Sequence, residues 1–185
     1  MMLNIPAKLF YRIGLRLKLK AYGVKYGNRI KGNRVVVKNI GQIIIGNNVS
    51  LKSFPDGEPY RTGLQTHCED AVIRIGDNCN LNGTMIHCRT KVTIGRFCMF
   101  GPGTKIVDND SHRISIDVIE RRKTPNSAPI IIGDNVWVGM NALILKGVEI
   151  GENAIVAAYS VVTKNVPENT LVAGNPAKIL KTLTK

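Results

Sequence analysis

Among the side chains of this chain that could do chemistry, His112 stands out because it lies in the polar run Asp108-Asn-Asp-Ser-His112-Arg. An imidazole titrates near neutral pH, so a positioned His is the side chain best matched to accepting a proton from a hydroxyl at pH 7. Asp108 or Asp110 could orient the ring and fix its tautomer, and the sequence does not choose between them. The alternative interpretation is a solvated loop histidine between solvated carboxylates.

The other two histidines each precede a cysteine, in the pairs His67-Cys68 and His87-Cys88. This composition suggests zinc, but the spacing matches no paired-ligand pattern, so we predict no metal site. The four cysteines fit a reduced cytoplasmic protein. No Ser or Cys sits in a nucleophile motif, which argues against a covalent enzyme intermediate.

The elements that must position these side chains are indicated by a short phrase that occurs four times, first as Ile45-Gly-Asn-Asn and last as Ile150-Gly-Glu-Asn. The phrase lies in a pattern with a period of six residues, which is neither a helical period nor strand alternation. This period is typical of a parallel β-helix built from hexapeptide repeats. The longest inward-facing aliphatic row is Ile132, Val138, Ile144, Ile150, Val156 and Val162, and the small or β-branched row beside it is Val136, Ala142, Val148, Ala154 and Ser160.

Each hexad predicts a short strand and a corner, and three hexads make one triangular coil that stacks on the next. Gly and Asn at the corners tolerate the left-handed backbone conformation. Earlier coils follow the same pattern, with Cys79 and Cys98 in the small-residue row, so we expect both thiols to be buried. The step from Ile75 to Ile94 is one residue too long for strict phase, which predicts a bulge or a loosened corner there.

Residues 107–128 interrupt the repeat with a polar, charged stretch that holds Pro125. This stretch is too long for a bulge and must leave the solenoid as a loop. A long excursion from an otherwise regular solenoid is usually functional. We therefore expect the loop to bring His112 to a site.

The N-terminal region is strongly basic. The net charge of the 185-residue chain is +13, and no acidic residue occurs before Asp56, which eleven Lys or Arg residues precede. Residues 5–20 predict a helix with Pro6 in its first turn. Its basic stripe is Lys8, Arg12, Arg16 and Lys20, and its apolar stripe is Leu9, Ile13 and Leu17.

Such a helix favours peripheral contact with an anionic membrane, and equally favours a cap over the open end of the solenoid. Nucleic acid is a weaker alternative, because no recognition motif or stacking platform accompanies the charge. We find no signal peptide and no membrane-spanning segment, so we expect a cytoplasmic protein, at the inner membrane face if the helix binds lipid. The expected organisation is a basic amphipathic segment over 1–30 and a hexapeptide-repeat domain over 31–185 with the loop at 107–128.

With these features in place, the chain resembles the hexapeptide-repeat acyltransferases, in the branch of the galactoside and maltose O-acetyltransferases and the acetyltransferases of polysaccharide biosynthesis. The resemblance covers residues 73–180. It rests on Ile132-Gly-Asp-Asn-Val-Trp-Val-Gly139, on Gly147-Val-Glu-Ile-Gly151, on the segment from Ser160 to Pro167 and on Ala173-Gly-Asn-Pro-Ala-Lys178. Bare hexads also occur in solenoids that are not enzymes.

The resemblance implies an all-β, left-handed parallel β-helix that forms a homotrimer, with acetyl-CoA as co-substrate in the groove between neighbouring chains. It implies transfer of the acetyl group to a hydroxyl of a sugar or glycan precursor, directly in a ternary complex. An acceptor carried on a lipid is a narrower possibility that the basic helix adds.

The resemblance also implies roles for particular residues. His112 matches the general base. Asn80, with Asn82 behind it, matches the Asn that stabilises the oxyanion in an Asn-aromatic-Asn segment, although Leu81 departs from the aromatic residue. Asn82 and Asp110 are candidates for substrate binding. The residues that match cofactor-binding positions are Trp137, Met140, Ala158, Thr163, Lys164 and Lys178, of which Met140 replaces a small residue and Lys178 an Arg.

Other functions stay open. Serine acetyltransferases share the β-helix but carry a large N-terminal helical domain, and about forty residues are too few for one. A nucleotide-sugar N-acetyltransferase needs a similar base. A zinc carbonic anhydrase on this fold needs three converging His, and here His67, His87 and His112 are scattered. A non-catalytic solenoid that serves as a binding module is the remaining alternative.

Overall fold

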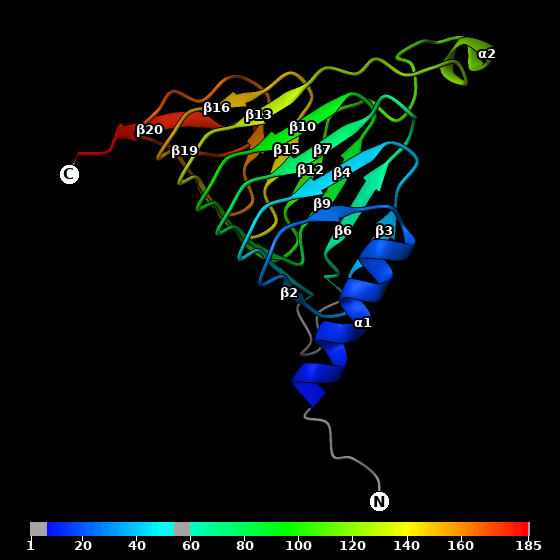
Figure 1. Cartoon of the computed structure of the whole chain (residues 1–185). Helices are drawn as coiled ribbons and strands as arrows, with labels where there is room; N and C mark the ends of the chain where they lie inside the picture. The colour runs from blue at the N-terminus through cyan, green and yellow to red at the C-terminus, as the bar shows by residue number, and fades with distance from the viewer. Residues whose placement is uncertain (1–6, 54–59, 185) are drawn as a thin grey trace, which may run out of the picture.

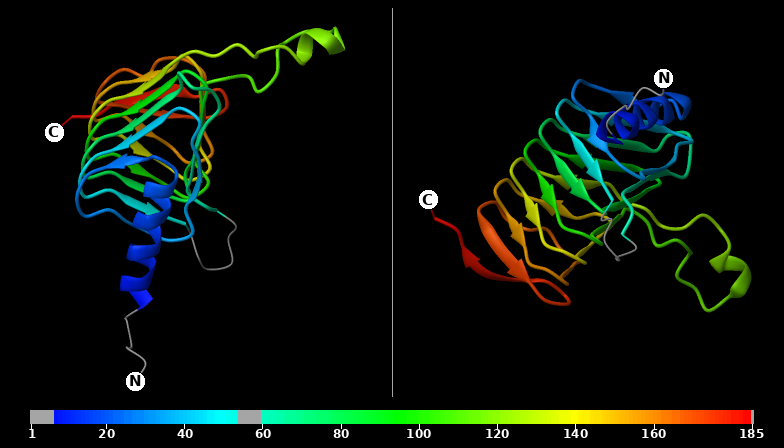
Figure 2. Two further views of the ribbon diagram at one scale, coloured as in Figure 1. Left: turned by 45° about the vertical axis from the view of Figure 1, so that its right-hand side comes forward. Right: turned by 90° about the horizontal axis from the view of Figure 1, so that it is seen from below.

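The structure, a computed structural model, describes residues 7–53 and 60–184. Three parallel sheets form the faces of a triangular prism, a left-handed parallel β-helix (Figures 1 and 2). Apart from the C-terminal antiparallel hairpin, consecutive strands belong to different sheets, so each strand pairs with strands one coil before or after it. The predicted fold class is confirmed.

We name the faces A, B and C in the order in which the chain visits them. Face A consists of β1 (Lys25–Tyr26), β4 (Gln42–Ile45), β7 (Val72–Ile75), β10 (Lys91–Ile94), β13 (Ile130–Ile132) and β16 (Glu149–Ile150). Face B consists of β2 (Lys31–Gly32), β5 (Ser50–Lys52), β8 (Asn80–Asn82), β11 (Met99–Phe100), β14 (Trp137–Val138), β17 (Ile155–Val156), β19 (Thr170–Ala173) and β20 (Lys178–Thr182). Face C consists of β3 (Val36–Lys38), β6 (Gly63–Thr66), β9 (Met85–Cys88), β12 (Lys105–Val107), β15 (Leu143–Leu145) and β18 (Val161–Val162).

The core is a stack of aliphatic rungs inside the prism. Ile75, Ile94 and Ile132 lie in register on three successive strands of face A, and each is almost fully buried. The small row predicted from Val136 to Ser160 is buried as well. Rungs of this kind bury each coil against its neighbours, so the stability of the prism comes from contacts between successive coils.

Asn residues hold four of the corners between faces A and B in the left-handed conformation, and Phe97 takes the same position in the coil between Asn78 and Asn135. Asn48, Asn78, Asn135 and Asn153 all have positive φ, and their side-chain amides bond along the stack, as in the 2.9 Å bond from Asn135 Nδ2 to Asn153 Oδ1. Asn adopts this conformation at low cost, and its amide can donate and accept. The last Asn of the repeated Ile-Gly-X-Asn phrase therefore both forms the turn and hydrogen-bonds to the Asn of a neighbouring coil.

The loosened coil is where the sequence predicted it. Ile75 pairs with Ile94 and Ile86 with Ile106, so the extra length falls at the corner around Arg89 and Thr90, between faces C and A. The β-helix also begins earlier than the predicted boundary at residue 31, since β1 at Lys25–Tyr26 already pairs with β4.

The N-terminal helix α1 (Ala7–Ala21) covers the open end of the prism (Figure 1). Leu15 and Leu19 are buried in the core, and Lys18 Nζ donates to the Val35 carbonyl. The predicted cap is therefore confirmed. Ile13 and Leu17, from the predicted apolar stripe, are instead 48% and 64% exposed. Residues 5 and 6, and the side chains of Lys8, Leu9 and Arg12, lie outside what the structure describes.

The predicted loop forms an arm that projects from the prism beside faces C and A (Figures 1 and 2). It starts after β12, carries the short helix α2 (Val118–Arg121) and returns to β13. An isolated antiparallel bridge joins Asn109 to Ser127 at its base. The side chains of Ile114, Ile116, Val118 and Ile119 near its tip are all exposed.

Candidate active site

The outer side of face B carries two of the predicted site residues in one row. Asn80, Met99 and Trp137 occupy the same register position on β8, β11 and β14. Met99 and Trp137 are 50% and 51% exposed, so this row is an apolar surface with an amide beside it. Asn82, the second outward residue of β8, is half-buried. The row could seat a thioester and present the Asn80 amide to a developing oxyanion.

His112 lies on the arm, away from this row. Its side chain is exposed, and its backbone N–H donates to the Asp110 carbonyl at 2.7 Å. The arm leaves the prism at the edge between faces C and A, which is the one edge that face B does not touch. Within one chain the structure therefore does not bring His112 to Asn80 or Trp137.

Asp108 holds the base of the arm and does not orient His112. Its buried carboxylate accepts the backbone N–H groups of Arg89, Thr90 and Lys91, at 2.7, 2.7 and 3.0 Å. Asn109 Nδ2 adds a fourth bond at 3.1 Å. These bonds satisfy the donors of the loosened corner, so Asp108 fixes the point from which the arm starts.

Asp110 forms an ion pair instead of facing the imidazole. Its Oδ1 lies 2.5 Å from Lys146 Nζ, on the segment that follows β15. Its Oδ2 is buried without a partner among the described residues. The pair ties the first turn of the arm to the prism, so neither carboxylate suggested as an orienting group for His112 is bonded to it in this structure.

The residues predicted to bind the cofactor gather toward the C-terminal coils. Met140 and Ala158 are exposed and stack at the edge between faces B and C, where Tyr159 N donates to the Met140 carbonyl. Thr163 and Lys164 are exposed at the far end of β18. Lys178 begins β20, next to Ala177, whose N–H donates to the Val161 carbonyl. The structure thus places Met140 and Ala158 along the edge between faces B and C. The cations Lys178 and Lys164 lie near the start and the end of β18, the last strand of face C.

A hollow of about 470 Å³ opens on face C at the base of the arm. Tyr60, Met85, His87, Lys105 and Ser111 are among the residues that line it, and Ser111 directly precedes His112. The hollow therefore lies next to the segment that carries His112, the predicted general base.

His87 in this hollow is stacked on His67 from the coil before. His67 Nε2 and His87 Nδ1 are 3.3 Å apart, and the rings lie 5.5 Å centroid to centroid at 14°. Burial, followed by the positive charges of Lys38 and Arg89, lowers the pKa of His67. Burial also lowers the pKa of His87, so both rings favour the neutral form.

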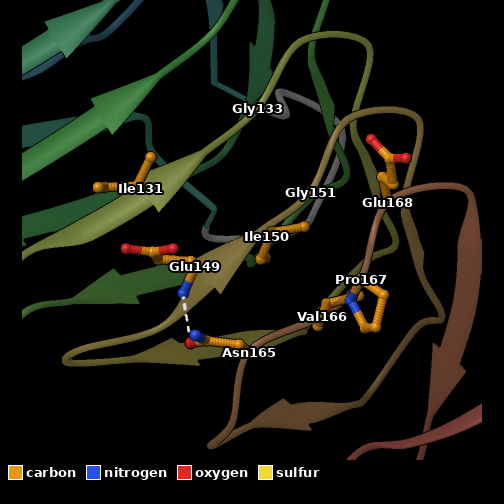
Figure 3. A pocket seen from close by; sticks show the side chains of 9 residues that line it. All are labelled: Ile131, Gly133, Glu149, Ile150, Gly151, Asn165, Val166, Pro167 and Glu168. Carbon is orange, nitrogen blue, oxygen red and sulfur yellow. Dashed lines mark hydrogen bonds between the residues drawn. The ribbon is translucent and has the colours of Figure 1, made fainter.

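A second hollow, of about 440 Å³, lies on face A at the C-terminal coils (Figure 3). Ile131, Val166 and Pro167 give it an apolar floor, and the carboxylates of Glu149 and Glu168 stand at its sides. None of the predicted site residues lines it. Two carboxylates disfavour the phosphates of a nucleotide, so we do not assign the cofactor to this hollow.

Comparison with known proteins matches the repeat to a family. The family model described as bacterial transferase hexapeptide (six repeats) matches residues 129–164. A galactoside O-acetyltransferase of Lactococcus lactis is 35% identical over 104 residues, which are 56% of this chain and 49% of that protein. Over residues 129–164 the chain therefore matches the hexapeptide-repeat transferase family.

Two solved structures of this family carry coenzyme A or its acetyl thioester. A hexapeptide-repeat acetyltransferase of Vibrio cholerae in complex with acetyl-CoA is 28% identical, with a TM-score of 0.60, over 100% of this chain and 81% of that one. A galactoside acetyltransferase in complex with coenzyme A is 26% identical, with a TM-score of 0.59, over 98% and 74% of the two chains. The chain spans about half the length of the first curated relatives that it matches.

One feature of the candidate site, the stacked pair of His67 and His87, was not predicted from the sequence. The His67–His87 pair was dismissed as scattered, although the register of β6 and β9 stacks the two rings. The coil length would have predicted the pair, because the two residues are about one coil apart.

The four cysteines are free, and Cys79, Cys88 and Cys98 are buried as small apolar groups.

Within residues 7–53 and 60–184, no cluster of three or more His, Cys, Asp or Glu is placed to hold a metal ion. The described helices include none that is long and apolar enough to cross a bilayer.

Proposed function

We propose that this chain is an acetyl-CoA-dependent O-acetyltransferase that acts on a hydroxyl of a sugar or glycan precursor. The observation that carries the proposal is the separation of two complementary half-sites. Face B offers an amide beside an exposed apolar row, and the arm offers an imidazole that its own face B cannot reach. The family match over residues 129–164 and the CoA-bound relatives support the same chemistry.

The half-sites meet if the arm of one chain reaches face B of the next, as in a closed homotrimer. The exposed apolar residues Ile114, Ile116 and Ile119 near the arm tip give such a contact a surface to bury. In the proposed site His112 takes the proton of the acceptor hydroxyl as it attacks the thioester carbonyl. The amide of Asn80 stabilises the oxyanion. The carbon–sulfur bond of the thioester then breaks, and coenzyme A leaves as the free thiol with the proton that His112 accepted.

The donor lies along the edge of Met140 and Ala158 in this proposal. The cations of Lys164 and Lys178 then bind the nucleotide phosphates, as point charges rather than as a bidentate fork. No acyl-enzyme forms, because both substrates are bound together and the described site offers no nucleophilic thiol or hydroxyl in a motif.

Release of free thiol from acetyl-CoA, measured with a panel of sugars, tests the activity. His112→Ala should lower kcat by roughly 10²- to 10⁴-fold, as expected for loss of a general base. Unchanged activity in that variant would exclude His112 as the base. Absence of coenzyme A binding in calorimetry would favour a non-catalytic binding module.

Mixing two inactive variants tests the shared site. Trimers reassembled from equal amounts of His112→Ala and Asn80→Ala chains should recover about a quarter of the wild-type activity, because a quarter of the sites combine two intact halves. A site built within one chain predicts no recovery.

We further propose that α1 places the enzyme on an anionic membrane surface, at the cytoplasmic face. Ile13 and Leu17 form an exposed apolar pair one turn apart, and the exposed cations Arg16 and Lys20 lie beside it. Deleting residues 1–20 would also remove the buried Leu15 and Leu19, so an informative test changes exposed positions only.

The double variant Ile13→Gln/Leu17→Gln should lose flotation with vesicles that contain anionic lipid while keeping its thermal stability. Equal flotation of the variant and the wild type would remove the membrane proposal and leave the enzymatic one intact.

A further inference from the structure

The hollow at the base of the arm is strongly basic. Lys105 and Arg61 line it and are exposed, while Lys38 and Arg89 lie close enough to His67 to act on its charge. None of these four cations forms an ion pair with any residue in the described part of the chain. Uncompensated charge of one sign around a concavity focuses the field and attracts ligands of the opposite sign.

The two acidic residues at the base of the arm, Asp108 and Asp110, do not neutralise this charge fully, because both are already engaged. The carboxylate of Asp108 is fully buried and accepts three backbone N–H groups. Asp110 is paired with Lys146. The lining that the structure describes contains no Asp or Glu.

The rest of the lining suits a sugar. Tyr60 offers an aromatic ring, Met85 an apolar wall, and Ser111 and His87 groups that can donate or accept hydrogen bonds. Lowered pKa values keep the stacked imidazoles neutral, so His87 can act as a hydrogen-bond partner without adding a further fixed charge. Since Ser111 directly precedes His112, a ligand seated here extends toward the proposed base.

We propose that this hollow binds an acidic acceptor, through a carboxylate or phosphate on the sugar that Lys105 and Arg61 contact. The proposal rests on the proposed acetyl transfer and specifies the substrate class for it. The site is distinct from the cations assigned to the donor: Lys105 lies on β12, two coils before β18, after which Lys164 follows.

The test compares Lys105→Gln with Arg74→Gln. Arg74 is an exposed cation on β7 of face A, so its substitution changes the net charge equally without touching the hollow. The acceptors are neutral oligosaccharides and matched ones that carry a uronic acid or a sugar phosphate, and the readout is thiol release.

We expect the wild type to prefer one acidic series. Lys105→Gln should raise KM for that series about tenfold, as for loss of one charged hydrogen bond, and leave KM for acetyl-CoA unchanged. Arg74→Gln should change neither. The carboxylate and phosphate series identify which anion is bound.

Three results would overturn the inference while leaving the proposed transferase intact: equal turnover of neutral and acidic acceptors, equal effects of the two variants, or a Lys105→Gln effect on acetyl-CoA alone. A separate binding experiment distinguishes this proposal from the enzymatic one. Calorimetric titrations with glucuronate and with glucose 6-phosphate should show binding to the wild type. This binding should be weaker for Lys105→Gln than for Arg74→Gln. Binding without any acyl transfer would contradict the enzymatic proposal, and no difference in binding between the two variants would contradict this one.

Discussion

Substitution of Asp108 by Asn should destabilise the fold strongly, although it replaces only one carboxylate oxygen with an NH₂ group. The carboxylate is 0% exposed and accepts three backbone N–H groups. Hydrogen bonds to a charged group contribute about 1.5–3 kcal/mol each, and a buried donor left unpaired costs about 1–3 kcal/mol. An Asn at this position keeps one acceptor oxygen and turns an NH₂ toward at least one backbone donor. We therefore expect a loss of about 3–5 kcal/mol in the free energy of unfolding.

Urea denaturation at fixed protein concentration, followed by circular dichroism, measures this loss. A slope of about 1–3 kcal/mol per molar urea converts it to a fall in the midpoint of roughly 1 M or more. Asp117→Asn is the matched control. That carboxylate also accepts two backbone N–H groups, at the start of α2, but it is exposed on the arm. Its loss should cost about 1 kcal/mol or less. A fall of under about 1 kcal/mol for Asp108→Asn, or equal effects of the two substitutions, would refute the reasoning.

Three further predictions concern the stability of the prism. Leu19→Ala should cost about 2–5 kcal/mol because Leu19 is fully buried under the cap, whereas the exposed Leu17→Ala should cost little, as thermal unfolding would show. Gly76→Ala should be destabilising by about 1–3 kcal/mol, since its Cβ would lie 2.5 Å from the backbone oxygen of Gly95, and a midpoint equal to that of the wild type would contradict this packing. Stability should fall as the pH drops below about 6.5, because the folded state lowers the pKa of His67 and His87 while the unfolded chain takes up protons there. The double variant His67→Asn/His87→Asn should flatten that part of the pH–stability curve.

The sequence predicted the coils well because each hexad repeats the same pattern of an inward aliphatic residue and a corner. A period of six, with Gly and Asn at the corners, specifies both the inward row and the turn, so Ile132 to Val162 fall where they were expected. The excess residue before Ile94 was equally visible, since a solenoid has a fixed coil length.

Side-chain partners across coils were harder to predict. Asp108 and Asp110 looked equivalent beside His112, yet one meets a corner 17 to 19 residues earlier and the other meets Lys146, 36 residues later. Such pairings depend on the exact register of non-neighbouring segments, which no local pattern encodes. The helix illustrates the same limit. Ile13 and Leu17 of the predicted apolar stripe face outward, because Leu15 and Leu19 are the residues that pack against the end of the prism.

The arm enters and leaves the prism at almost the same place, because the bridge between Asn109 and Ser127 closes its base. The strands on either side, β12 and β13, keep their pairing with the coils before and after as though the arm were absent. Beyond the anchors at Asp108 and Asp110, a change in the length of such an insertion adds little to the entropy of closing the loop. Evolution, or a protein engineer, could therefore exchange the arm for another of different length and chemistry, and so alter the molecules that are modified without rebuilding the scaffold.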